Sequence, residues 1–317
     1  MKLYRHSEDI YRLELPMPLL GSVNAYLVRG ERGYTIIDTG MRSEQAIEQW
    51  EGIIAGGIAI ERVIVTHCHP DHMGLAGWLQ QRFRVPVHIP RRGFERMKEA
   101  ELLLRSAPAG DGRPLPLFAL HEGPLYPAAA MWKSIVEDAF EPDGLLEEGQ
   151  NIRIGSYSFR VIGTPGHSHD HLCFYSAELK QMFTGDHVLE GPSPFLSITS
   201  EADGDPLGDY LQALDSVARF DIDCVFPGHG EPFRTLKMRA EEIRRNHEFR
   251  MEQLLDHLTC EGLTAGQMTR RVYGDDSGSG KRFMEFQVTL ARLIHLERMG
   301  RVKGVEREGK VVFTRVP

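Results

Sequence analysis

The segment "THCHPDHMG", residues 66–74, places the strongest constraint on how this chain can fold and what it can bind. It contains three histidines and an aspartate within six consecutive positions, directly after the apolar run "RVIVT", which is typical of a buried strand. In an extended segment alternate side chains share a face, so His67 and His69 can point at one metal ion while Cys68 points away. The pattern therefore predicts a metal site where this strand ends.

Three later loops carry further residues of metal-ligand type, and each loop follows a strand-like run: "TPGHS", "TGDH" and "PGHG". His167 of the first loop can complete a set of three imidazoles around one metal. His229 of the third loop can join Asp71 and His72 around a second metal, with Asp186 bridging the two. The expected metal ligands are therefore His67, His69, Asp71, His72, His167, Asp186 and His229.

Asp38, in "IIDTG", is expected to orient the histidine segment through hydrogen bonds rather than to bind metal. Two metals roughly 3.5 to 4 Å apart would share a bridging hydroxide. This hydroxide forms near neutral pH because a bound cation lowers the pKa of water. Asp71 is expected to orient this hydroxide as well. We therefore predict catalytic roles for Asp71 and Asp38 and two Zn²⁺ ions as cofactors, with Fe or Mn as alternatives.

The whole set resembles, in order, the five motifs of the metallo-β-lactamase fold superfamily over roughly residues 10–234: Asp38, then His67, His69, Asp71 and His72, then His167, Asp186 and His229. The resemblance implies an α/β fold, an αββα sandwich with the site at one edge and zinc as the usual metal. Zinc β-lactamases lack the bridging aspartate, and some carry a cysteine where this chain has Asp186. Antibiotic hydrolysis is therefore not expected.

The full ligand set is closer to that of glyoxalase II-like thioesterases, acyl-homoserine lactonases and the RNA-cleaving branches of this superfamily. The segments "TPGHSHDHLCFYS" and "FTGDHVL", with the C-terminal tail, look most similar to the branch that contains a mitochondrial single-strand endoribonuclease and fungal acyl-carrier thioesterases. The resemblance implies a binuclear zinc hydrolase acting on an ester, thioester or lactone of a small acyl substrate. A single-strand endoribonuclease and an iron-dependent persulfide dioxygenase stay open as alternatives.

The chain of 317 residues is expected to hold two domains. Residues 1–234 alternate strand-like and helical patterns, including a helix capped by Ser43, which predicts a catalytic α/β domain. A loop-rich insertion at about 91–148 is expected to cover the substrate. Residues 235–317 predict a small winged-helix-like domain, with helices near 236–258, 264–273 and 281–299 and a hairpin that turns at Glu308 and Gly309.

The net charge of -8 is unevenly distributed along the chain. Residues 235–317 carry 16 Lys and Arg against 12 Asp and Glu, whereas residues 1–234 carry 21 against 33. An acidic catalytic body disfavours phosphate chains, so nucleic acid is an alternative partner but not the favoured one. We expect the tail to form a homodimer or to dock on the body. Its interleaved basic residues include Arg270, Arg271, Lys281, Arg282, Arg292, Arg298 and Arg301.

The N-terminal sequence does not have the pattern of a signal peptide, because Pro16, Pro18 and Gly21 interrupt its apolar stretch. No segment has the roughly 18 to 20 unbroken apolar residues of a membrane span. We therefore expect a cytoplasmic protein with no membrane partner. The four cysteines are scattered without a CxxC pair, which argues against a disulfide framework, and Cys68 is expected to be a buried structural thiol.

Other residues near the predicted site have less specific interpretations. His169 and His171 are expected to support the ligand loop through hydrogen bonds. Trp132, Phe118 and Tyr126, in the insertion, could form an apolar wall against the substrate or could pack within the insertion. The sequence leaves both roles open for these three aromatic residues.

Overall fold

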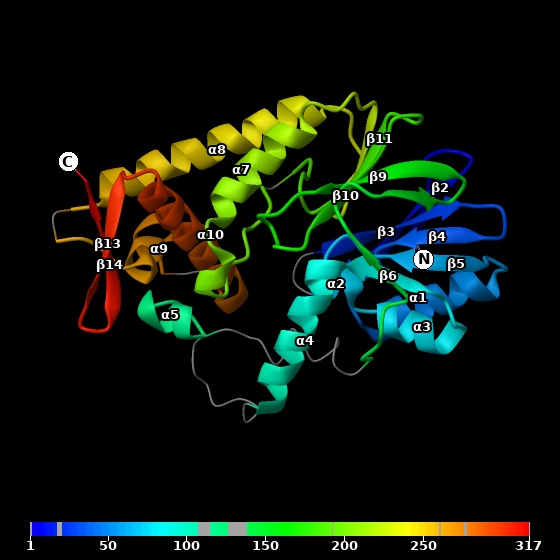
Figure 1. The fold of residues 1–317 in the computed structure, drawn as a ribbon, viewed down its shortest axis with the longest axis horizontal. Coiled ribbons are helices and arrows are strands. Elements are labelled where there is room, and N and C mark those ends of the chain that lie inside the picture. Colours follow the sequence, from blue (N-terminus) through cyan, green and yellow to red (C-terminus); the bar gives the residue numbers. More distant parts are fainter. Residues whose placement is uncertain are drawn as a thin grey trace.

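The computed structural model describes residues 2–17, 21–106, 115–125, 138–191, 193–259, 261–275 and 278–316. Within these residues the strands form a seven-stranded sheet, a five-stranded sheet and a two-stranded hairpin. The two larger sheets lie at one end of the molecule, and the C-terminal helices and hairpin lie at the other (Figure 1).

The first sheet contains seven strands arranged in chain order. They are β1 (Lys2–Arg5), β2 (Ile10–Met17), β3 (Gly21–Arg29), β4 (Tyr34–Ile37), β5 (Ile60–Ile64), β6 (Val87–Pro90) and β7 (Gly144–Leu146). Strands β1 to β4 pair antiparallel, and β4 to β7 pair parallel. Because parallel neighbours end at the same edge, the segments that follow β4 and β5 emerge side by side.

Helices α1 (Glu44–Ala55) and α3 (Ala76–Phe83) bury an apolar layer against one face of this sheet. Trp50 of α1 is fully buried, and its indole nitrogen donates a hydrogen bond to Thr39 O. The side chain of Ser43 accepts a hydrogen bond from Ala46 N and begins α1, which confirms the predicted cap.

The second sheet has the strand order β12-β11-β10-β9-β8. Its strands are β8 (Asn151–Ile154), β9 (Tyr157–Gly163), β10 (Leu172–Ser176), β11 (Gln181–Gly185) and β12 (Cys224–Pro227). Buried aromatic rings, including Tyr26, Phe159, Phe183 and Phe226, fill the space between the two sheets. Helices α7 (Pro206–Val217) and α8 (Leu236–His257) cover the other face. The layers are helix, sheet, sheet and helix, which confirms the predicted sandwich.

The insertion is shorter than the expected range of about 91–148, because β7 pairs parallel with β6 and so belongs to the first sheet. Its described part forms α4 (Arg91–Ser106) and the short α5 (Pro116–Leu120). Phe118 of α5 packs against Phe283 and Phe286, with ring centroids 5.8 and 4.9 Å away. It therefore contacts the C-terminal helices and forms no substrate wall. Trp132 and Tyr126 lie outside the described residues.

The C-terminal segment consists of α8, α9 (Ala265–Tyr273), α10 (Ser279–Arg298), β13 (Val302–Arg307) and β14 (Lys310–Arg315). Thr264 caps α9: its hydroxyl oxygen accepts a hydrogen bond from Gln267 N, and its own backbone N donates one to Gln267 Oε1. The hairpin turns at Glu308 and Gly309, whose φ angles of 52° and 74° match a two-residue type I′ turn. Three helices followed by a hairpin are the elements that the sequence predicted here.

One apolar core joins this C-terminal segment to the catalytic body. A continuous cluster of buried residues runs from Met182 of the second sheet, through Tyr210 of α7, to Phe286 of α10 and Phe313 of β14. Burial of apolar surface stabilises a fold in proportion to area, so both parts gain stability from the same cluster. The division into 1–234 and 235–317 stays our proposal, with the addition that the two parts share a core.

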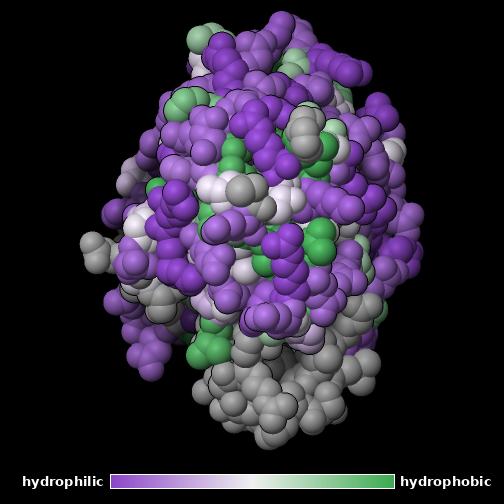
Figure 2. Space-filling view, turned by 90° about the vertical axis from the view of Figure 1, so that its left-hand side faces the viewer, coloured by the Kyte–Doolittle hydropathy of each residue, from purple (hydrophilic) through white to green (hydrophobic). Residues whose placement is uncertain are grey.

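None of the helices described by the structure has both the length and the apolar character needed to cross a bilayer. The face at the C-terminal end is mainly hydrophilic, with apolar side chains in small separate patches (Figure 2). Exposed large apolar residues include Met238, Phe249, Met299 and Val305. Scattered apolar residues of this kind are usual on protein surfaces and do not by themselves indicate an interface.

The variant Phe286→Ala tests the shared core. Phe286 is fully buried, so its truncation should lower the free energy of unfolding by about 3–5 kcal/mol. Chemical denaturation followed by tryptophan fluorescence and by circular dichroism should show one shifted transition for both signals. The control Phe249→Ala changes an α8 side chain that is 59% exposed, and it should alter stability by less than about 0.5 kcal/mol. Two separate transitions would contradict a common core.

Candidate metal centre

The predicted ligands come together at the edge where strands of both sheets end. Asp38 follows β4, and residues 66–74, which include the short helix α2 (Pro70–Met73), follow β5. His167 follows β9, Asp186 follows β11 and His229 follows β12. Residues far apart in the sequence therefore meet outside the ends of the strands, which is where α/β folds commonly place their sites.

The first group of ligand atoms consists of three histidine nitrogens. His67 Nε2 lies 3.0 Å from His69 Nδ1 and 3.2 Å from His167 Nε2. The remaining pair, His69 Nδ1 and His167 Nε2, is 2.9 Å apart. The rings of His67 and His167 are buried, and His69 is partly exposed. Three nitrogens that converge in this way can hold one cation.

The second group combines two histidines with two carboxylates. His229 Nε2 lies 3.3 Å from Asp71 Oδ2 and 3.4 Å from Asp186 Oδ2. His72 Nε2 lies 3.3 Å from Asp186 Oδ1 and 3.6 Å from Asp71 Oδ2. Asp186 Oδ2 is also 3.5 Å from His167 Nε2 of the first group. Asp186 thus lies between the two groups, where a bridging ligand would lie.

Hydrogen bonds on the far side of two rings leave lone pairs that point into the first group. His167 Nδ1 lies 2.7 Å from Phe195 O, which can only accept, so Nδ1 carries the proton and Nε2 does not. His67 Nδ1 lies 3.0 Å from Thr66 Oγ1, whose own proton is donated to Asp38 Oδ2. The unprotonated nitrogens of His67 and His167 therefore face each other and repel unless a cation lies between them. These residues fit a metal ion.

The second group contains buried polar atoms without partners. His72 Nε2 and Asp186 Oδ1 are 3.3 Å apart, but within the described part of the chain neither has a partner with the geometry of a hydrogen bond. The far nitrogens are fixed, since His229 Nδ1 lies 2.7 Å from Ser22 O and His72 Nδ1 lies 2.8 Å from Asp38 Oδ2. Buried polar atoms seldom lack a partner, so this group fits a second cation.

Burial sets the protonation of the first group. It lowers the pKa of His67 well below the usual value, and the neighbouring histidines lower it further. Burial likewise lowers the pKa of His69 to about 3 and lowers the pKa of His167. The three imidazoles are therefore neutral at physiological pH, which is the form that binds a metal ion.

The carboxylates of the second group create a demand for positive charge. Burial would raise the pKa of Asp71, but the charge on His72 and a hydrogen bond from His229 lower it to about 2. Burial also opposes the ionisation of Asp186, yet His229 and His72 hold its pKa well below the usual range. Without a cation, protons supply this positive charge. Burial would lower the pKa of His229, but the negative charge of Asp186 outweighs this effect and raises the pKa to about 10. A divalent cation would displace such protons.

Asp38 holds the histidine segment from behind. Its Oδ1 accepts a hydrogen bond from Thr66 N, and its Oδ2 accepts one from Thr66 Oγ1, both at 2.8 Å. The same Oδ2 binds His72 Nδ1. Asp38 is buried and has a φ of 60°, a left-handed conformation that few residues other than glycine adopt. We propose that Asp38 positions the ligands and does not itself bind metal.

Two residues that help to build the site were missed from the sequence. Asp170 Oδ2 accepts a hydrogen bond of 2.8 Å from Cys68 N and so fixes the backbone between two ligands. The ring of Phe195, whose carbonyl binds His167, stacks on His69 with centroids 5.6 Å apart and planes at 13°. Asp170 lies in the motif "HSHDH" and could have been found. Phe195 acts through its backbone and its ring position, for which the sequence holds no signal.

The structure confirms the prediction for one of the two loop histidines, His171, and contradicts it for the other, His169. His171 Nε2 accepts a hydrogen bond of 3.1 Å from Asp186 N, and its Nδ1 lies 2.7 Å from Thr164 Oγ1, so the predicted support is confirmed. His169 is exposed and makes no hydrogen bond within the ranges that the structure describes, so the same prediction is wrong for it. Cys68 is 4% exposed, as expected for a structural thiol, and burial raises its pKa well above the usual value.

A separate network holds the loop that carries His229. Asn24 Nδ2 donates hydrogen bonds to Pro227 O at 3.0 Å and to Gly230 O at 2.8 Å. Arg12, which is 1% exposed, donates to Gly230 O at 2.7 Å. Both donors belong to the first sheet and both acceptors flank His229. The network therefore ties a ligand of the second sheet to the strands of the first.

Comparison with known proteins gives consistent matches. A model of the Metallo-beta-lactamase superfamily matches residues 19–229. The chain is 27% identical to the probable metallo-hydrolase YqjP of Bacillus subtilis, over 84% of this chain and 86% of that protein. It is 26% identical to an atrochrysone carboxyl ACP thioesterase of Emericella nidulans, over 92% of this chain and 76% of that protein. The chain spans 62% of the length of two longer fungal lactamase-like proteins.

A solved structure is similar over nearly the whole chain. The crystal structure of a beta-lactamase domain protein from Burkholderia ambifaria has a TM-score of 0.86 and 27% sequence identity. The match covers 99% of this chain and 94% of that chain. The similarity therefore includes the C-terminal helices and hairpin as well as the two sheets.

The variant Asp38→Asn should weaken metal binding while the chain stays folded. Asp38 accepts three hydrogen bonds through two oxygens, and an asparagine amide has only one oxygen, so the substitution removes at least one of the bonds that fix Thr66 and His72. We expect a loss of about 10- to 100-fold in affinity for zinc, measured by competition with a zinc indicator dye. Asp223→Asn, at an exposed position, is the matched control. Equal affinities for the wild type and Asp38→Asn would contradict the positioning role.

Proposed function

Because the chain belongs to the metallo-beta-lactamase superfamily, we propose that it is a hydrolase that holds two zinc ions and cleaves an ester, thioester or lactone bond in a small acyl substrate. The observation that carries the proposal is the pair of adjacent ligand groups connected by Asp186. Relatives named as a metallo-hydrolase and as an ACP thioesterase support this class of reaction.

The proposed ligands form two sets, which are the two groups of atoms that lie close to one another. His67, His69 and His167 hold one cation, and Asp71, His72 and His229 hold the other, with Asp186 between them. When bound, such cations supply an activated water near neutral pH and positive charge for the oxygen of the scissile carbonyl. The chain itself supplies the preorganised ligands and excludes bulk water from most of them, since four of the seven side chains are buried and the other three are only partly exposed.

Asp71 is proposed to orient the attacking water in addition to binding metal. Its side chain is 13% exposed, so it is one of the ligands that a water molecule can reach. Its low pKa, which its histidine neighbours maintain against the effect of burial, keeps the carboxylate ionised and able to accept a hydrogen bond. His229, at 21% exposed, lies beside it and marks the open side of the group.

The charges of the described residues favour an acyl substrate over RNA. Arg292 of the tail is buried and donates to Tyr273, and Arg301 makes two hydrogen bonds to Glu252. Lys281 lies 3.7 Å from Glu285. Basic side chains that pair within the protein do not form a continuous groove for phosphates, and residues 1–234 are acidic overall. The endoribonuclease remains a second candidate because its branch has a similar tail.

The proposed reaction is tested with acyl thioesters. Zinc-loaded protein should hydrolyse a panel of short- and medium-chain acyl thioesters, and chelation should remove the activity, which zinc should restore. Asp186→Asn should lower kcat by at least about 100-fold, because it weakens the bridge between the two groups. Elemental analysis should find two zinc ions in the wild-type chain.

The control Asp223→Asn should retain wild-type activity, since this side chain is exposed and lies outside the site. Cleavage of labelled single-stranded RNA without thioester hydrolysis would favour the endoribonuclease. One iron and no zinc in protein purified from its native source would favour the oxygenase. Either result would overturn the proposed acyl hydrolase.

A further inference from the structure

A second hollow lies between the C-terminal segment and residues of the catalytic body, outside the metal centre. It has a volume of about 300 Å³ and is walled by α5, the segment around η1 (Glu201–Asp203), α10 and the β13-β14 hairpin. The walls include the apolar side chains of Leu117, Ile198, Ile294 and Phe313. A hollow of this size is at the lower end of the range for small-molecule sites.

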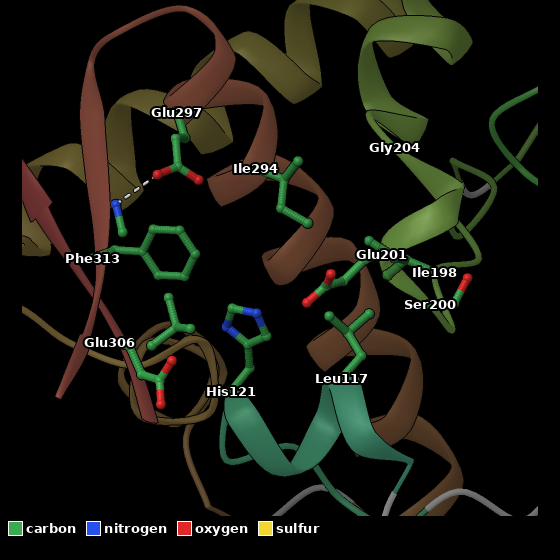
Figure 3. Close-up of a pocket in the computed structure, with 12 residues that line it drawn as sticks. Leu117, His121, Ile198, Ser200, Glu201, Gly204, Ile294, Glu297, Glu306 and Phe313 are labelled. Atoms are coloured by element: carbon green, nitrogen blue, oxygen red, sulfur yellow. Dashed lines mark hydrogen bonds between the residues drawn. The ribbon is translucent and has the colours of Figure 1, made fainter. Parts of the chain in front are cut away.

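His121, the residue after α5, projects into this hollow between Phe313, Ile294 and Glu201 (Figure 3). It is 6% exposed, and its ring stacks on that of Phe313 with centroids 5.6 Å apart and planes at 16°. Its Nδ1 is buried and has no hydrogen-bond partner among the residues described. Burial lowers the pKa of His121 to about 4, so the ring is neutral at physiological pH. The ring therefore offers unused hydrogen-bonding capacity inside the hollow.

Three carboxylates from separate elements surround the same hollow: Glu201 of η1, Glu297 of α10 and Glu306 of β13 (Figure 3). One oxygen of Glu297 accepts a hydrogen bond of 2.8 Å from Gly304 N, which fixes that carboxylate at the rim. None of the described residues that line the hollow is a lysine or an arginine. The field at the opening therefore attracts cations and repels anions.

The acidic groups are too widely spaced for a metal ion. Within the described parts of the chain, the side chains that converge closely enough to hold a metal are those of the two groups at the strand ends, and His121 and the three glutamates are not among them. A single metal ion would leave most of these carboxylates without a positively charged partner. An extended ligand can place a cationic group near the rim and an apolar body against Phe313 and its neighbours.

We propose that this hollow binds a small organic cation, an amine with an apolar or aromatic body. Its ammonium group lies among Glu201, Glu297 and Glu306, where one N–H donates to the unpartnered His121 Nδ1, and its body packs on the rings of His121 and Phe313. The site shares no residue with the metal centre, so the proposal stands independently of the proposed hydrolysis. It assigns a ligand to the C-terminal segment that is neither nucleic acid nor an acyl substrate.

The test is a titration of the full-length, zinc-loaded protein with three matched probes: 2-phenylethylamine, 2-phenylethanol and 3-phenylpropanoate. We expect the amine to bind at least about 10-fold more tightly than the alcohol at low ionic strength, and the carboxylate to bind more weakly than both. Added salt should reduce the preference for the amine. Equal binding of the three probes, or no binding of the amine, would overturn the proposal.

Variants of the residues that line the hollow test whether the amine binds there. The double variant Glu201→Gln/Glu306→Gln removes two exposed charges at the rim and should weaken amine binding by at least about 5-fold. The matched control Glu241→Gln/Glu248→Gln removes two exposed charges from α8 and should leave the affinity unchanged. His121→Phe retains the ring and removes its nitrogens, and it should also weaken binding of the amine. An amine that binds equally to the rim variant and the control lies elsewhere, which would refute the site.

Discussion

The convergence of unprotonated histidine nitrogens is the interaction on which the rest of this structure depends. His67 and His167 present Nε2 atoms to each other at 3.2 Å because their other nitrogens are fixed by Thr66 and by Phe195 O. Such an arrangement has an unfavourable energy in isolation, and only a rigid scaffold can maintain it. The buried aromatic layer between the sheets contributes to this rigidity, because a close-packed interior resists displacement of the strands that it contacts.

Much of the site followed from the sequence because its ligands lie in short motifs at the ends of strands. The spacing of His67 and His69 predicted one group, and the turn to Asp71 and His72 predicted the other. The α/β fold followed from the order of strand-like and helical patterns and from the family resemblance. Ser43 was predicted as a helix cap because capping depends on the local sequence and does not need tertiary context.

The parts that could not be predicted depend on contacts distant in sequence. Phe195 positions His167 through a carbonyl, and every residue has a carbonyl, so nothing in the sequence marks this one. The strand β7 was assigned to the insertion because its three residues are too short for a recognisable pattern. From the sequence, Phe118 could line the substrate or pack within the insertion, and the tertiary fold instead places it against the C-terminal helices.

The C-terminal segment contributes to the geometry of the metal centre through one loop. Gln287 of α10 is 1% exposed, and its Oε1 accepts a hydrogen bond of 2.9 Å from Ile198 N. One residue earlier, Ser197 N donates to His167 O at 2.9 Å, and Phe195 O binds the ring of the same histidine. The orientation of a proposed ligand thus depends on a loop that a C-terminal helix holds in place. Because Ile198 also lines the second hollow, a ligand bound there would contact the segment that fixes His167.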